Sequence, residues 1–314
     1  MGAGHGKGAG HAHGHAAGRA EDRSRLKLVL LVTCSVIAVE LVGAWLSGSL
    51  ALLADAGHMV TDAAAVALAL SASYVATLPP TSRRTFGFHR AEILAALVNA
   101  VVLLGVCTYL AYAAISRLLD PVEVEAGSML VFAAIGLVAN AVSLGVLSRR
   151  KDASLNMKGA YLEVLSDLVG SALVVVAGVV VAATGFTRAD SITSLLIAAL
   201  ILPRSFSLLR SAVDVLLETT PAHVNLDDVR QHLEKVPGVV DVHDLHAWMI
   251  TSGMPMLSVH VTVTDQVLAE RGVGALLDEF SECVASHFEV QHATFQIEPA
   301  THRGHEHLGE VEHH

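Results

Sequence analysis

Charged and aromatic residues are scarce in this 314-residue sequence: Asp, Glu, Lys and Arg make up 16% of it, and Phe, Trp and Tyr only 4%. The three cysteines, Cys34, Cys107 and Cys283, lie far apart without a C-x-x-C spacing, so neither a redox pair nor a thiolate metal site is expected. The formal net charge of -10 leaves no basic excess for binding nucleic acid. These shortages exclude a disulfide scaffold and a nucleic-acid partner.

Hydrophobic residues are abundant instead, at 53% of the chain with a mean hydropathy of +0.56, and they gather in long runs. A helix needs about 20 mostly apolar residues to cross the hydrocarbon core of a lipid bilayer. Six runs reach that length, so the sequence predicts an α-helical membrane protein with six transmembrane helices. The runs are Leu26 to Leu46, Leu50 to Leu78, Ala91 to Leu118, Ser128 to Leu147, Lys158 to Ala183 and Ser191 to Leu209, which together form a membrane domain over residues 26–210.

Lys and Arg are distributed unevenly around these runs, and the positive-inside rule assigns the basic segments to the cytoplasm. The opposite connections hold only Arg117 and Arg188. Six spans then place both termini in the cytoplasm. The cytoplasmic basic residues would be Lys7, Arg19, Arg23, Arg25, Lys27, Arg83, Arg84, Arg90, Arg149, Arg150, Lys151 and Lys158.

Residues 211–300 have the composition of a soluble domain. Asn225 is typical of a helix N-cap, and Pro237 with Gly238 should end the helix that follows. Alternating apolar residues around a Ser-Gly turn then predict strands. The expected order is αββαβ, a small α/β domain similar to ferredoxin and metallochaperone folds. Its later elements are expected at Val239 to Ile250, Met256 to Val263, Leu268 to Phe288 and Ala293 to Glu298.

Six ionisable side chains lie inside the predicted spans, where each charged group near the bilayer centre costs roughly 2.5 to 3.5 kcal/mol. Hydrogen bonds between packed helices are one explanation for such residues, above all for the isolated Glu40. The spacing of the others favours a binding site. The six residues are Glu40, Asp55, His58, Asp62, Glu163 and Asp167.

His58 and Asp62 are four residues apart in the second run, and Glu163 and Asp167 repeat this spacing in the fifth. Residues i and i+4 share one helix face, so two helices offer four ligands whose chemistry matches tetrahedral Zn2+. Three carboxylates are untenable together in a low-dielectric site unless a metal or protons bind, so metal release should be coupled to proton uptake. No H-E-x-x-H, G-x-S-x-G or phosphate-binding motif indicates an enzyme.

Several segments resemble the cation diffusion facilitator family, which includes bacterial exporters of zinc, cobalt and cadmium. SGSLALLADAGH at 47–58, followed by Asp62, is similar to the second-span signature of that family. FGFHRAE at 86–92, followed by LVNA, is similar to its third-span entry, and the likeness continues through VHDLH at 242–246. The resemblance runs from about Leu26 to Pro299.

The resemblance implies a homodimer in the inner (cytoplasmic) membrane that exports Zn2+ from the cytoplasm in exchange for H+ by alternating access. It places the transport site at His58, Asp62, Glu163 and Asp167. Zinc-selective members usually carry His where this chain has Glu163. A carboxylate oxygen is a harder ligand than an imidazole nitrogen, in the sense of hard and soft acids and bases. Co2+, Cd2+, Mn2+ and Fe2+ are therefore alternative substrates.

The resemblance also implies a regulatory metal site in the cytoplasmic domain, at the dimer interface. His243, His246, His260 and Glu298 are its candidate ligands, whereas Gln296 stands where some members have His. The alternative interpretation is that these are ordinary polar residues on the face of a sheet.

The connection between the second and third predicted spans departs from the family in one respect and matches it in another. Family members can carry a metal site in this loop, built from Asp and His. We do not expect that site here, because residues 81–85 read TSRRT and His89 is one position away from the histidine of those members. Arg90 and Glu218, however, occupy positions that form an ion pair in relatives. We expect the same pair in this chain.

Histidines cluster at both chain ends, among Gly and Ala in residues 1–25 and among Glu in residues 301–314. Such segments are too poor in apolar residues to fold. Their imidazoles would hold metal loosely near a cytoplasmic entrance, unless the tails have no selected function. The candidate ligands of the N-terminal tract are His5, His11, His13 and His15.

Two other functions remain open from the sequence. A metal-gated channel needs a continuous polar pore, whereas the spans offer mainly Asn99, Asn140 and scattered Ser and Thr, which favours alternating access. A membrane-tethered metal sensor would use the C-terminal domain for signalling and would not need Glu163 or Asp167 to move an ion.

Overall fold

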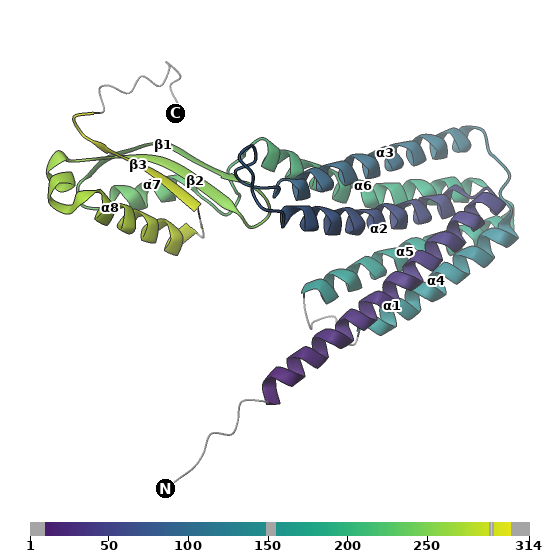
Figure 1. The fold of residues 1–314 in the computed structure, drawn as a ribbon. Coiled ribbons are helices and arrows are strands. Elements are labelled where there is room, and N and C mark those ends of the chain that lie inside the picture. The colour runs from purple at the N-terminus through teal and green to yellow at the C-terminus, as the bar shows by residue number, and fades with distance from the viewer. Residues whose placement is uncertain (1–9, 149–154, 289, 291, 303–314) are drawn as a thin grey trace, which may run out of the picture. The chain divides into compact units, whose positions relative to one another are not determined.

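The computed structural model describes the backbone of residues 10–148, 155–288, 290 and 292–302, and side chains within these ranges from residue 27 onward except 155 and 156. Six helices in this part of the chain are long and apolar enough to cross a membrane, which confirms the six predicted spans (Figure 1). They are α1 (Gly10–Ser47), α2 (Leu50–Ala76), α3 (Ala91–Leu119), α4 (Ala126–Ser148), α5 (Leu155–Thr184) and α6 (Arg188–Leu216).

Two helices extend beyond the predicted spans. The expectation that residues 1–25 do not fold is wrong for the backbone from Gly10 onward, which belongs to α1. Alanine has high helix propensity, and extending an existing helix avoids the cost of nucleating a new one. α6 similarly continues to Leu216 rather than ending at Leu209. The prediction ended too early because the last turns of this helix carry polar residues, and a search for apolar runs excludes them.

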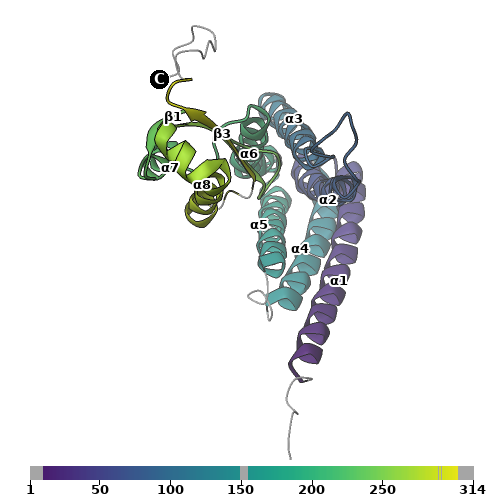
Figure 2. The same ribbon diagram turned by 60° about the vertical axis from the view of Figure 1, so that its left-hand side comes forward.

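Helix α4 packs between α1 and α5, and small residues bring these helices close together (Figure 2). A Cβ atom at Gly43 of α1 would lie 2.5 Å from the Phe132 side chain of α4. A Cβ atom at Gly178 of α5 would lie 2.8 Å from Leu130 of the same helix α4. Small residues at helix contacts favour association inside a bilayer, where burying apolar side chains against one another gains little over contact with lipid.

Asp190, near the start of α6, caps the N-terminus of α2. Its carboxylate accepts hydrogen bonds from the backbone N–H groups of Leu50 at 2.8 Å and Ala51 at 3.1 Å, and from the Ser49 hydroxyl. The first N–H groups of a helix have no partners within the helix, so this carboxylate satisfies them and complements the helix dipole. Asp190 is fully buried and thereby ties α2 to α6.

The C-terminal domain has the predicted αββαβ order. Strand β2 lies at the centre of a three-stranded sheet, antiparallel to β1 and parallel to β3. α7 and α8 cover one face, and the buried side chains of Leu233, Leu276 and Phe280 form part of the core between helices and sheet (Figure 1). The elements are α7 (Leu226–Glu234), β1 (Val239–Met249), β2 (Pro255–Val263), α8 (Asp265–Phe288) and β3 (His292–Pro299).

Two local features of this domain follow from its sequence. Asn225 is the N-cap of α7 as predicted, because its side chain accepts a hydrogen bond from the Asp227 N–H at 3.0 Å. α8 begins at Asp265, earlier than expected, and is interrupted at Gly272, where φ is 77°. Glycine tolerates this left-handed backbone without a Cβ clash, so the kink falls at that residue.

Replacing Asp190 by Ala should lower the thermal stability of the detergent-solubilised protein. Three buried donors lose their acceptor, and each buried hydrogen bond to a charged group contributes about 1.5 to 3 kcal/mol. Thermal unfolding followed by size-exclusion chromatography should show a melting temperature several degrees lower. Asp120→Ala, at an exposed position, is the matched control; an equal loss in both variants would contradict the capping role.

Candidate metal sites

The four residues predicted for the transport site meet between α2 and α5. His58 and Asp62 lie one turn apart on α2, with His58 Nε2 3.4 Å from Asp62 Oδ2. The same His58 nitrogen lies 4.0 Å from Oδ1 of Asp167 on α5. Glu163 is one turn before Asp167 on the same face of α5. The structure therefore brings His58, Asp62 and Asp167 into contact, with Glu163 on the adjoining turn of α5.

Several polar atoms of this set are buried without a hydrogen-bonding partner among the described residues. They are His58 Nδ1, Asp62 Oδ2 and Asp167 Oδ1. His58 and Asp167 are 6% and 4% exposed, so water does not satisfy them from outside the helix bundle. An unsatisfied buried polar atom is costly, and a cation held by these atoms would remove that cost.

Arg204 of α6 belongs to the same site, although the sequence argument did not identify it. Its guanidinium NH2 nitrogen lies 3.2 Å from Oε2 of Glu163. An arginine within a predicted span was the signal that could have found it, because a charge in a membrane helix needs a partner. Glu163 stands where zinc-selective members of the resembled family usually have His. Its carboxylate pairs with the positive charge of Arg204.

A cavity of about 340 Å³ lies beside His58 and Arg204. It lies between α2, α5 and α6, with Arg204 and His58 in its lining as well as Asp55 and Gly170, one turn away from the ligands along α2 and α5. Apolar side chains complete the wall, among them Leu162, Leu165 and Leu200. Of the four candidate ligands, His58 lines this cavity.

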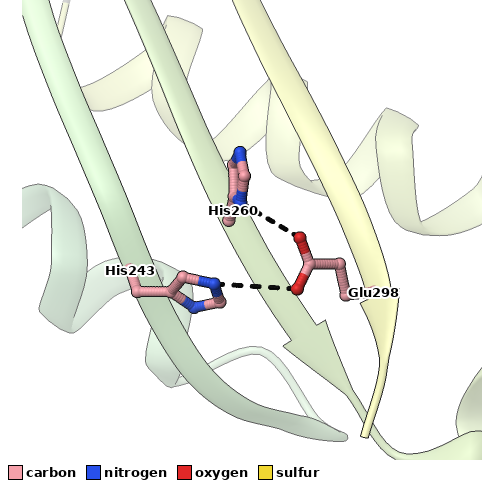
Figure 3. A group of neighbouring side chains, drawn as sticks. All are labelled: His243, His260 and Glu298. Atoms are coloured by element: carbon pink, nitrogen blue, oxygen red, sulfur yellow. Dashed lines mark ion pairs between the residues drawn. The ribbon is translucent and has the colours of Figure 1, made fainter. Parts of the chain in front are cut away.

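A second cluster lies on the sheet of the C-terminal domain. Figure 3 shows His243 of β1, His260 of β2 and Glu298 of β3 pointing toward one another. Glu298 Oε2 is 3.6 Å from His243 Nε2, and Glu298 Oε1 is 3.0 Å from His260 Nδ1. Among the described residues, these three form the one set of at least three candidate ligands with atoms all within 4.8 Å of one another.

Strand register explains this cluster. His243 is directly opposite His260 on the antiparallel β1–β2 pair, and opposed side chains on one face are neighbours. Glu298 lies on the same face of the adjacent strand and is only 2% exposed. Two imidazoles and one carboxylate are donors that Zn2+ and related ions accept, leaving a fourth position open, so the residues present fit a metal ion.

His246, the fourth candidate ligand, does not join this cluster. The β1–β2 register shifts between His243 and His246, and Asp244 between them has φ of 47°. This bulge turns His246 toward Asp244, with His246 Nε2 2.9 Å from Asp244 Oδ1. Asp244 also lies 3.5 Å from His260, and neither Asp244 nor the nearby Asp241, 3.0 Å from His243, was predicted. The side chain of Gln296 donates a hydrogen bond to Glu298 Oε1 at 2.7 Å.

The remaining predictions have different outcomes. The Arg90–Glu218 ion pair is confirmed, with Arg90 NH2 2.8 Å from Glu218 Oε1. A turn closed by paired hydrogen bonds between Thr81 and Arg84 occupies the loop between α2 and α3. Of the N-terminal histidines, His5 lies outside the described residues. The backbones of His11, His13 and His15 belong to α1, but their side chains are not described.

Six membrane-spanning helices with a buried imidazole and carboxylate cluster define the chain as a multi-pass membrane protein of the transporter class. A model of the cation efflux transmembrane domain matches residues 26–217, and a model of the cation efflux protein cytoplasmic domain matches residues 221–300. The chain therefore belongs to the cation efflux, or cation diffusion facilitator, family. This is a family of membrane transporters rather than an enzyme class.

Similar proteins cover most of this chain. The metal cation efflux system protein CzcD of Cupriavidus metallidurans is 43% identical over 275 residues, 88% of this chain and 86% of that protein. The zinc transporter ZitB of Escherichia coli is 40% identical over 269 residues, 85% and 84% of the two chains. A cadmium, cobalt and zinc/H(+)-K(+) antiporter of Bacillus subtilis is 35% identical over 282 residues, 88% and 90%.

Removing the charge of Arg204 should tighten metal binding at the membrane site. Arg204→Gln takes a positive charge away from the cation and frees Glu163, and a unit charge at this range is worth about 1 to 3 kcal/mol at an effective dielectric constant near 20. Affinity for Zn2+ in detergent should rise roughly tenfold. Arg210→Gln on the same helix, whose partner Asp214 is 3.8 Å away, should leave it unchanged. Weaker binding in Arg204→Gln would contradict this role.

Truncating His260 should weaken metal binding by the C-terminal domain far more than truncating His246. His260→Ala removes a ligand-type nitrogen beside the buried Glu298, whereas His246 is 54% exposed at its side chain and lies apart. Isothermal titration of the full-length protein with Zn2+ should lose one class of sites in His260→Ala. Retention of that class, or its loss in His246→Ala alone, would contradict the assignment.

Proposed function

We propose that this protein exports a divalent metal cation, most favourably Zn2+, and exchanges it for protons by alternating access. The observation that carries the proposal is the cluster of His58, Asp62, Glu163 and Asp167, which contains buried polar atoms without hydrogen-bonding partners among the described residues and whose His58 lines a cavity between α2, α5 and α6. Such a cluster is costly in a membrane protein unless it binds a cation. Its ligands come from two helices, so a change in their relative position opens or closes the site.

The charges of the site support exchange of one divalent ion for protons. Three carboxylates with the Arg204 guanidinium leave a net charge of -2 when His58 is neutral, which one divalent cation cancels. When the ion leaves, the same low-dielectric surroundings require replacement charge, and protons on the carboxyl groups supply it. Metal release and proton uptake are thereby coupled through charge neutrality.

The relatives support the substrate class. CzcD is named as a metal cation efflux protein, ZitB as a zinc transporter, and the Bacillus protein as an antiporter of cadmium, cobalt and zinc. We infer Zn2+ as the principal substrate, with Co2+, Cd2+, Mn2+ and Fe2+ as alternatives. The carboxylate of Glu163 in place of an imidazole favours the broader range, because harder ligands discriminate less strongly for zinc.

We further infer a homodimer in the inner (cytoplasmic) membrane with both termini in the cytoplasm. The C-terminal residues match a family model of a cytoplasmic domain, and basic residues concentrate in the corresponding connections. Within that domain, His243, His260 and Glu298 would hold a regulatory metal ion. The sheet edge at β1 offers backbone groups for contact with a second copy.

Asp167→Asn should abolish metal transport while the protein still inserts and folds. The substitution keeps the shape of the side chain and removes a negative charge that pairs with the cation. Zn2+ uptake into proteoliposomes with an internal pH dye should give opposite metal and proton fluxes for the wild type and neither flux for the variant. Asp120→Asn, on the exposed connection before α4, is the matched control.

The same assay separates the other two functions. Metal flux without opposite proton flux would establish a channel. No flux for Zn2+, Co2+, Cd2+ or Mn2+ in the wild type would establish a metal sensor and overturn the proposal.

A further inference from the structure

Two buried carboxyl groups of the membrane helices have no role in the metal site. Glu40 of α1 is 0% exposed and Asp55 of α2 is 1% exposed. Both Glu40 carboxyl oxygens are buried without a hydrogen-bonding partner among the described residues. A Cβ atom added at Gly136 would contact Glu40 Oε1 and lie 3.6 Å from the hydroxyl oxygen of Ser171, the residue that also hydrogen-bonds Asp55. An ionised carboxylate buried without a donor is costly, and a bound proton removes that cost.

Four helices build the surroundings of this pair. The Ser171 hydroxyl of α5 donates to Asp55 Oδ2 at 2.9 Å, and Asn140 Nδ2 of α4 donates to the Ser171 oxygen at 3.1 Å. Glycines leave the space that the carboxyl groups occupy. A Cβ atom at Gly170 would lie 2.5 Å from Asp55 Oδ1, and a Cβ atom at Gly136 would clash with Glu40 Oε1.

The charges around the pair favour a bound proton rather than a second ionised carboxylate. α5 contributes Asp167, one turn from Ser171, and Asp167 adds negative charge. α4 contributes only uncharged groups, Gly136 and Asn140. The Arg204 guanidinium of α6 is paired with Glu163 at 3.2 Å. From α1 and α2, the ionisable groups beside Ser171 are Glu40 and Asp55 themselves. Two like charges in contact in a low-dielectric interior are not both ionised.

The pair lies next to the metal ligands. Asp55 is one helical turn before His58 on α2, and both residues line the same cavity. Asp55 is also closer than His58 to the Leu50 end of α2, which the distribution of basic residues places away from the cytoplasm. A proton held there lies between the metal ligands and the outer end of the helix.

We propose that Glu40 and Asp55 form a proton-binding site, separate from the metal ligands, that takes up protons from the outer side and passes them to the transport site when the metal ion leaves. The inference rests on the proposed metal and proton exchange and deepens it by naming the residues that hold the exchanged proton. The transfer is acid–base only: one carboxyl oxygen loses the proton and a carboxylate oxygen of the transport site gains it.

Glu40→Gln tests this role with little structural change. Glutamine keeps the size of the glutamate side chain, while the exchangeable carboxyl proton is lost. Zn2+ affinity should remain unchanged, whereas proton-driven Zn2+ transport should slow about tenfold. The number of protons moved per metal ion should fall. Asp55→Asn, which still accepts from Ser171, should behave in the same way.

Infrared difference spectra on metal binding give an independent measurement. The wild type should show protonated-carboxyl bands that shift in heavy water, and the band of the Glu40–Asp55 pair should be absent from Glu40→Gln and present in the exposed control Glu123→Gln. An unchanged ratio of protons to metal ions in Glu40→Gln, with the band retained, would overturn the site. Absence of proton flux in the wild type would instead contradict the proposed exchange, and the band would still report on the pair.

Discussion

The low dielectric constant of the membrane interior is the constraint on which the rest of this structure depends. A charged group there needs a partner of opposite charge, a proton or a metal ion, because water is not available to stabilise it. The chain nevertheless places Glu40, Asp55, Asp62, Glu163 and Asp167 in its membrane helices, with His58 among them. Two contacts answer that excess of negative charge directly: Ser171 donates to Asp55, and Arg204 pairs with Glu163.

The bundle separates this negative charge into two neighbouring levels. At one level, the candidate metal ligands contact one another and Arg204, and His58 and Arg204 line a cavity. At the next, the carboxyl groups of Glu40 and Asp55 are packed closely against Gly136 and Gly170, and Asp55 borders the same cavity. The two levels would suit the two cations of the proposed exchange, a metal ion at the first and a proton at the second.

The candidate metal cluster of the C-terminal domain has the same kinds of side chain in other surroundings. His243 and His260 are partly exposed on a sheet, and solvent stabilises them whether or not a metal is bound. Metal binding at this cluster is therefore not required for charge neutrality, so the cluster can be empty or occupied. That property suits the proposed regulatory site, whose occupancy would follow the metal concentration. Glu298, buried beneath both rings, supplies the negative charge that favours a cation.

The sequence by itself determined the six spans, the αββαβ order and the two pairs of candidate ligands on α2 and α5, because apolar length, strand alternation and i, i+4 spacing are local properties. The tertiary structure alone decided that Arg204 reaches Glu163, that Glu40 and Asp55 are both buried beside Ser171, and that His246 turns toward Asp244. These contacts depend on helix packing and on a bulge in β1, which join residues distant in sequence or break a local period. The N-terminal histidine tract shows the same limit, since composition predicted an unfolded segment where the backbone of α1 already begins.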